Sequence, residues 1–144
     1  MASDLIAKIF LPALASKLKA MREEIRTVIE SVCSDAEYID HIVIAINEAS
    51  MNVIQHAYKE GENGNIVLEI YKDNDQLVFH VIDFADSIEV NKIKPMDMSE
   101  LRPGGLGLHI IEDVMDEMRF IENENGRGNI LEMKVRLNPC VEKS

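Results

Sequence analysis

The pattern of hydrophobic and polar positions predicts a helical first half of the chain and a strand-rich second half. Residues 5–11 form a short apolar run that predicts a strand. Apolar residues then recur at helical spacing over residues 13–32. The same helical spacing returns over a second stretch, which Ser34 or Asp35 could cap and which ends near Tyr58. Two helices are therefore expected to follow the first strand.

Further along the chain the period changes to two, which is typical of β-strands. Residues 65–83 predict a hairpin that turns at residues 72–75, and residues 118–137 predict a second hairpin that turns at residues 124–128. Between them, residues 104–118 begin rich in glycine and become helical. This order predicts an α+β two-layer sandwich, with helices on one face of a mixed or antiparallel sheet.

Length and charge narrow the class of protein. The 144 residues contain no linker rich in glycine, serine or proline, so we expect one domain over residues 1–144. The formal net charge of −11 would repel the phosphates of DNA or RNA, which argues against direct nucleic-acid binding.

The cysteines and the N-terminal stretch bear on localisation. Cys33 and Cys140 show neither a metal-binding spacing nor a disulfide framework, so we expect two reduced thiols in a cytoplasmic protein. Asp4 stands where a signal peptide has basic residues, and Lys8 interrupts the apolar run. No stretch is long enough to span a bilayer, so we expect no membrane attachment.

The second predicted helix carries a line of polar side chains opposite its apolar stripe. At about 100° per residue, Glu48, Asn52, Gln55 and Lys59 share one face. In most helices such a line is only a solvated face. Here apolar residues flank it, which indicates partial covering: Ile44, Ala45 and Met51. Glu48 and Asn52 are one turn apart, where a carboxylate can accept a proton and an amide oxygen can bind Mg²⁺.

A glycine-rich stretch suits an anion. Gly104 and Gly105 precede a helix that begins at Leu106 or Gly107. Glycines allow a close approach of the backbone, and the partial positive charge of a helix N-terminus suits a phosphate. Arg102 could assist. The plainer alternative is a flexible loop.

In order and spacing, these features resemble the GHKL ATPases, which have the Bergerat nucleotide-binding fold. The shared pattern consists of Glu48 and Asn52 on a helix, Asp83 after a strand, and residues 104–108 opening a helix. Taken alone, Asp83 is more simply explained as a turn residue that ends a strand. Two segments look like the bacterial anti-sigma-factor serine kinases: residues 47–58 and 100–120. The resemblance extends over nearly the whole chain.

The resemblance implies a role for each matching residue. Glu48 corresponds to the general base for the attacking hydroxyl, Asn52 to the Mg²⁺ ligand, and Asp83 to the aspartate that reads the adenine amino group. Residues 88–103 correspond to the nucleotide lid. The other implied ATP-binding positions are Ala85, Arg102, Gly104, Gly105, Leu106, Gly107 and Leu108. Gly128 and Asn129 fall where such proteins often have Gly-Thr.

The implied function is that of an ATP-dependent serine/threonine kinase and anti-sigma factor. Such a protein phosphorylates a serine of a STAS-type anti-sigma antagonist, sequesters a sigma factor by partner switching, and forms a homodimer. One alternative is a nucleotide-binding partner-switch module with weak or no catalysis. A histidine-kinase catalytic domain is less favoured, because no pair of phosphoacceptor helices precedes the domain.

A departure from the family pattern generates a prediction. The first glycine box of the superfamily reads Asp-x-Gly-x-Gly, whereas Ala85 and Ser87 replace both glycines here. If position 85 requires a positive φ, its methyl group costs about 1–2 kcal/mol. Ala85→Gly should then tighten nucleotide binding by up to about tenfold in titration calorimetry. Unchanged affinity together with a lower Tm of the nucleotide-free protein would show instead that Ala85 is relaxed.

Overall fold

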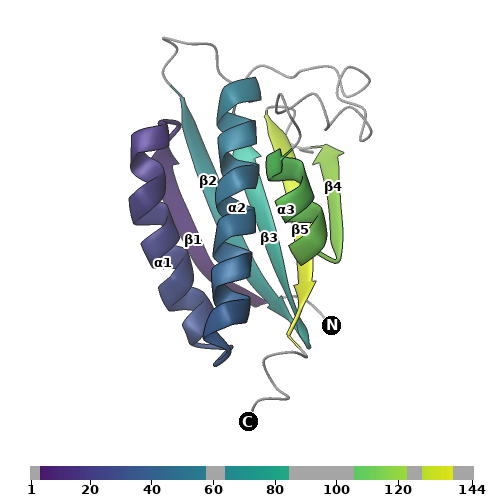
Figure 1. Ribbon diagram of the computed structural model, residues 1–144. Coiled ribbons are helices and arrows are strands. Elements are labelled where there is room, and N and C mark those ends of the chain that lie inside the picture. Colours follow the sequence, from purple (N-terminus) through teal and green to yellow (C-terminus); the bar gives the residue numbers. More distant parts are fainter. Residues whose placement is uncertain (1–3, 58–63, 85–105, 123–127, 138–144) are drawn as a thin grey trace.

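The computed structural model describes residues 4–57, 64–84, 106–122 and 128–137 (Figure 1). The strands are β1 (Asp4–Pro12), β2 (Asn65–Asp73), β3 (Gln76–Asp83), β4 (Glu117–Glu122) and β5 (Asn129–Arg136). The helices are a 3₁₀ turn η1 (Ala15–Lys17), α1 (Leu18–Glu30), α2 (Ala36–Ala57) and α3 (Leu106–Val114). The five strands pair in the order β1-β2-β3-β5-β4, and each described pair is antiparallel. All three α-helices lie on one face of this sheet, so the predicted α+β sandwich is confirmed.

The hydrophobic core lies between the helices and the sheet face that they cover. α2 buries the stripe that the sequence predicted, and its most buried members are Ile39, Ile42, Val43, Ile46 and Ala49. α1 contributes four buried side chains at helical spacing: Leu18, Met21, Ile25 and Ile29. β2 and β3 supply alternate residues from the other side, among them Ile66, Leu68, Leu77 and Phe79. Full burial of each such side chain stabilises the fold by about 1.5–3 kcal/mol.

Two element boundaries differ from the sequence prediction. The first helix begins with a 3₁₀ turn and becomes an α-helix only at Leu18. The third helix ends at Val114, whereas helical spacing had suggested about residue 118. The backbone N–H of Asp116 donates to the carbonyl of Lys134 (2.8 Å), and the Asp116 carboxylate accepts from the N–H of Arg136 (2.8 Å). These bonds bring the chain into the sheet before another helical turn can form.

The structure also bears on the cysteines and on membrane attachment. Cys33 is buried and disulfide-bonded, so the expectation of a reduced thiol is wrong at this position. Cys140 lies outside the described residues. In the described part of the chain, no helix has both the length and the apolar character needed to cross a membrane.

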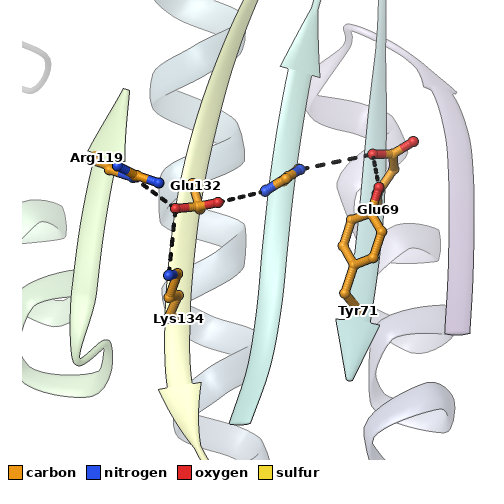
Figure 2. A network of polar contacts seen from close by, with 6 residues as sticks. Glu69, Tyr71, Arg119, Glu132 and Lys134 are labelled. Atoms are coloured by element: carbon orange, nitrogen blue, oxygen red, sulfur yellow. Dashed lines mark hydrogen bonds and ion pairs between the residues drawn. The ribbon is translucent and has the colours of Figure 1, made fainter. Parts of the chain in front are cut away.

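A row of charged side chains crosses the sheet face that the described helices leave open. Lys8, Glu69, His80, Glu132 and Arg119 stand directly opposite one another on five successive strands. Lys8 Nζ lies 3.5 Å from Glu69 Oε2, and His80 Nδ1 lies 3.9 Å from Glu69 Oε1. His80 Nε2 lies 2.9 Å from Glu132 Oε2, and Arg119 Nε donates to Glu132 Oε1 at 2.8 Å (Figure 2). The row therefore links all five strands through side chains.

Two more side chains join this network from the next row of the same face. The Tyr71 hydroxyl donates to Glu69 Oε1 (2.7 Å), and Lys134 Nζ lies 4.0 Å from Glu132 Oε1 (Figure 2). Burial, with the hydrogen bond to Glu69, raises the pKa of Tyr71 to about 12. Tyr71 therefore remains a hydrogen-bond donor at all physiological pH values.

The row on the other side of the charged one is apolar. Its members also stand opposite one another across the five strands: Phe10, Val67, Ile82, Ile130 and Ile121. Phe10 on the edge strand β1 is 70% exposed, whereas Val67 on the neighbouring strand β2 is only 4% exposed. The open face thus combines a paired charged row with an apolar row that is exposed at Phe10 and partly or fully buried elsewhere.

The charged row generates a prediction about acid stability. Burial works to raise the pKa of Glu132, but hydrogen bonds from His80 and Arg119 outweigh it and hold that pKa below its ordinary value. The folded state therefore releases this proton more readily than the unfolded state. The resulting stability is present above the unfolded pKa and is lost as the pH falls through the lower folded pKa.

Glu132→Gln should therefore lower the Tm at neutral pH, and the difference from the wild type should shrink as the pH falls below about 4.5. Thermal unfolding followed by circular dichroism at a series of pH values would measure it. Glu117→Gln, an exposed glutamate on β4, is the matched control. A difference for Glu132→Gln that stays constant with pH would contradict the assignment.

Candidate functional site

The elements that carry the predicted site residues converge at one end of the sandwich. β3 ends there at Asp83, β5 begins there at Asn129, and these two residues are paired across the sheet. In Figure 1, α2 ends and α3 begins at this same end of the molecule. α3 also packs against α2. Segments far apart in the sequence therefore bring their polar residues to one region.

α2 presents Glu48 and Asn52 one turn apart. Glu48 is partly buried, and Asn52 is only 2% exposed, although helical geometry had put it on the polar side. Gln55, further along the same line, is exposed. The expectation that part of this face is covered is therefore confirmed for Asn52.

The side-chain oxygen of Asn52 is an unusual feature. It is buried, and within the described ranges it has no hydrogen-bond partner. An unpaired buried acceptor costs about 1–3 kcal/mol, so such an atom is expected to have a partner in the functional state. Mg²⁺ prefers oxygen ligands and commonly takes one or two from the protein, with phosphates and water supplying the rest. The residues present therefore fit a magnesium ion.

Asp83 lies at the end of β3 with 5% of its surface exposed. Asn129 Nδ2 lies 3.1 Å from Asp83 Oδ1 and 3.5 Å from Oδ2, so the amide donates to the carboxylate. Gly128, just before Asn129, has a φ of +85°, and a Cβ built there would lie 1.9 Å from the carbonyl oxygen of Asp83. Only glycine allows this approach of the two strands, and the approach fixes Asn129 beside the carboxylate.

One contact near the site was not anticipated from the sequence. Arg22 Nη1 on α1 donates to Asn47 Oδ1 on α2 at 2.9 Å. Asn47 immediately precedes Glu48, so this bond joins the two helices beside the proposed base. The only signal in the sequence was Arg22 on the polar side of the first helix, and a surface position alone does not identify a partner 25 residues away.

α3 opens with three of the predicted phosphate-binding positions. Leu106, Gly107 and Leu108 form its first turn, where helix N–H groups carry partial positive charge. The remaining predicted site residues lie outside the described residues, as does the predicted lid over residues 88–103: Lys59, Ala85, Arg102, Gly104 and Gly105.

A shallow depression of about 410 Å³ lies elsewhere in the groove between α2 and α3. Its lining is mostly apolar: His41, Ile44, Ile110, Asp113 and Val114. None of these is a predicted site residue. Ile44, which the sequence placed beside the polar line, is 45% exposed there.

Comparison with known proteins agrees with this geometry. The family model of the histidine kinase-like ATPase domain matches residues 11–135. The serine-protein kinase RsbW of Bacillus subtilis is 35% identical in an alignment that covers 71% of this chain and 71% of the relative. The serine-protein kinase RsbW of Staphylococcus aureus is 36% identical over 142 residues, covering 82% of this chain and 88% of the relative.

A solved structure shares the fold. The crystal structure of the RsbU and RsbW domains of Rv1364c from Mycobacterium tuberculosis matches with a TM-score of 0.59 at 21% identity. The match covers 90% of this chain and 32% of that chain, so this chain spans about a third of the longer protein.

These comparisons confirm the resemblance on which the sequence analysis relied, and with it the prediction of a protein serine kinase that uses ATP. The chain belongs to the histidine kinase-like ATPase family and, within it, to the serine-protein kinases of the RsbW type.

Proposed function

We propose that this protein transfers the γ-phosphoryl group of ATP to a serine of a small STAS-type anti-sigma antagonist, and that it sequesters a sigma factor by partner switching. The observation that carries the proposal is the pair on α2, with Glu48 one turn before an Asn52 whose buried oxygen suits a metal ion. The names of the two RsbW relatives support a serine as the acceptor.

In this proposal the transfer step needs little covalent chemistry from the protein. The serine hydroxyl oxygen attacks the γ-phosphorus, the bond from that phosphorus to the bridging oxygen of ADP breaks, and Glu48 accepts the hydroxyl proton. Mg²⁺, when bound, neutralises the charge that builds up on the phosphate oxygens, and Asn52 is its protein ligand. The N–H groups that open α3 hold the phosphates, and Asp83 accepts from the adenine amine.

The protein partners follow from the family resemblance and fit the charge. A chain of net charge −11 suits a protein partner better than nucleic acid. A homodimer is part of the proposal, and it follows from the family resemblance. The proposed compartment is the cytoplasm.

A second candidate is a nucleotide-binding partner-switch module with weak or no catalysis. The observation in its favour is the loss of both glycines from the first glycine box, at Ala85 and Ser87. An assay of phosphate transfer from radiolabelled Mg-ATP to the cognate antagonist separates the two candidates. Nucleotide binding without transfer would favour the second, and binding of neither ADP nor ATP at millimolar concentration would exclude the kinase.

The role of Glu48 gives one prediction. Glu48→Gln keeps the shape of the side chain and removes its proton affinity, so transfer should fall by about 10²–10⁴-fold. Nucleotide affinity should stay within a few-fold. Single-turnover transfer and calorimetry would measure the two quantities. Glu37→Gln, at the exposed start of α2, is the control. A parallel loss of binding and transfer would contradict the role of general base.

The role of Asn52 gives a different prediction. Asn52→Ala removes the buried oxygen, so Mg²⁺-dependent ATP binding should weaken by tenfold or more, while binding measured with EDTA present should change little. Because the oxygen has no partner in the described structure, the Tm of the nucleotide-free protein should be nearly unchanged. Gln55→Ala, exposed on the same helix face, should affect neither quantity. Equal weakening with and without Mg²⁺ would refute the assignment of Asn52 as a metal ligand.

A further inference from the structure

Cys33 has a covalent bond that the proposed kinase chemistry does not use. It lies in the turn between α1 and α2, where it is 5% exposed and disulfide-bonded. The chain contains one other cysteine, Cys140, which follows the end of β5. A bond to a second copy of the chain would require a sulfur at the surface, and the burial of Cys33 does not provide one. Cys140 of the same chain is therefore the partner that fits.

The turn between α1 and α2 and the end of β5 are held together by other contacts. The Tyr38 hydroxyl, in the first turn of α2, donates to the carbonyl of Arg136, the last residue of β5, at 2.6 Å. Burial, with the nearby charge of Asp116, raises the pKa of Tyr38 to about 12, so this donor persists at physiological pH. Leu137 is buried in the same core cluster as Cys33. In Figure 1 the turn and the strand end lie at the same end of the molecule.

This arrangement leaves only a short distance for the chain to cover. Cys140 comes three positions after Leu137. An extended chain advances about 3.3–3.6 Å per residue, so three positions can span about 10 Å. A disulfide adds a further separation of about 4.4–6.8 Å between its two Cα atoms. The contacts of Tyr38 and Leu137 therefore bring the two cysteines within reach of one another.

We propose that Cys33 and Cys140 form a reversible bond that fastens the C-terminal residues to the turn between α1 and α2, so that the stability of this protein responds to the redox state of low-molecular-weight thiols. In the cytoplasm, the proposed compartment, a disulfide is usually transient and either catalytic or redox-sensing. Its removal should loosen this end of the fold rather than unfold it. A buried free cysteine behaves as a small apolar residue, and Cys33 Sγ lies 3.9 Å from the carbonyl oxygen of Asp35, within reach of a thiol donor.

The burial of Cys33 also determines how the bond exchanges. An attacking thiolate, such as that of glutathione, reaches the sulfur of Cys140 and forms a mixed disulfide there. Cys33 leaves as a thiolate and takes up the proton that the attacking thiol released. A second glutathione then attacks the mixed disulfide, which yields the thiol of Cys140 and oxidised glutathione. Two glutathione molecules are thus oxidised for each protein disulfide that is reduced.

The test compares the full chain after equilibration in oxidised and in reduced glutathione. Peptide mapping of the oxidised protein under non-reducing conditions should recover Cys33 joined to Cys140 within a single chain. The bond closes a loop of most of the chain, so the Tm should fall by about 5–15 °C on reduction. Cys140→Ser is the matched control: it should have the Tm of the reduced wild type in both conditions. Cys33→Ala should likewise abolish the response to glutathione.

Three results would overturn the inference. Thiol titration of the unfolded protein could find both cysteines free after oxidation. A non-reducing gel could show that the bond joins two chains, which would refute the intramolecular pairing. A bond that persists in excess reduced glutathione would be a permanent structural link and not a redox-sensitive one. The inference does not depend on the proposed function, so none of these results bears on the kinase proposal.

Discussion

The rotation of α2 about its own axis is the constraint on which the candidate site depends. Its buried stripe packs against the sheet, with Ile42, Ile46 and Ala49 fully inaccessible to solvent. Burial of about five such side chains contributes on the order of 10 kcal/mol. The unpaired oxygen of Asn52 costs only about 1–3 kcal/mol. The apolar contacts therefore dominate, and α2 cannot turn to give that oxygen to solvent.

The register of the sheet is a second constraint, and it couples the two faces. The same β3–β5 pairing aligns His80 with Glu132 on the open face and Asp83 with Asn129 at the site. Because side chains alternate between faces, a slip of β5 by one residue would turn both Glu132 and Asn129 to the wrong side. The charged row spans every strand, from Lys8 on β1 to Arg119 on β4, and its pairs form only in the observed register. Figure 2 shows the part of it around Glu69 and Glu132. The network on one face thus favours the alignment that the other face requires.

Sequence periodicity was sufficient to predict most of the fold. The broad stripe of α2 and the two alternating hairpins each depend on one segment at a time, so local patterning predicts them. The 3₁₀ start of α1 and the early end of α3 depend instead on contacts from distant segments, such as the bond from Asp116 to Lys134. The fully antiparallel pairing of the described strands likewise required knowledge of which strands are neighbours.

The contacts of the candidate site also fall into two groups: those that a single segment predicts and those that depend on distant segments. Glu48 and Asn52 are one turn apart on a single helix, so the sequence alone predicted that they act together. The pair of Asp83 and Asn129 is 46 positions apart and forms only because β5, not β4, lies beside β3. The bond between Arg22 and Asn47 depends in turn on the packing of α1 against α2. Alternation predicted most of the strands that carry the charged row, but the partners of its residues follow only from the register.

The acidity of the chain makes phosphate binding depend on local groups. With a net charge of −11, the average field of the protein repels a nucleotide, but screening limits this effect beyond about 8 Å at physiological ionic strength. Within that distance the proposed site pairs each carboxylate with a nearby neutral amide. Asn52 lies one helical turn after Glu48, and Asn129 donates to Asp83. In the proposed function Glu48 accepts a proton and Asp83 accepts from an amine, while the two amides serve as a ligand and a donor without adding negative charge. In that proposal, neutral amides are how a strongly acidic chain holds an anionic substrate close to a carboxylate that acts as its general base.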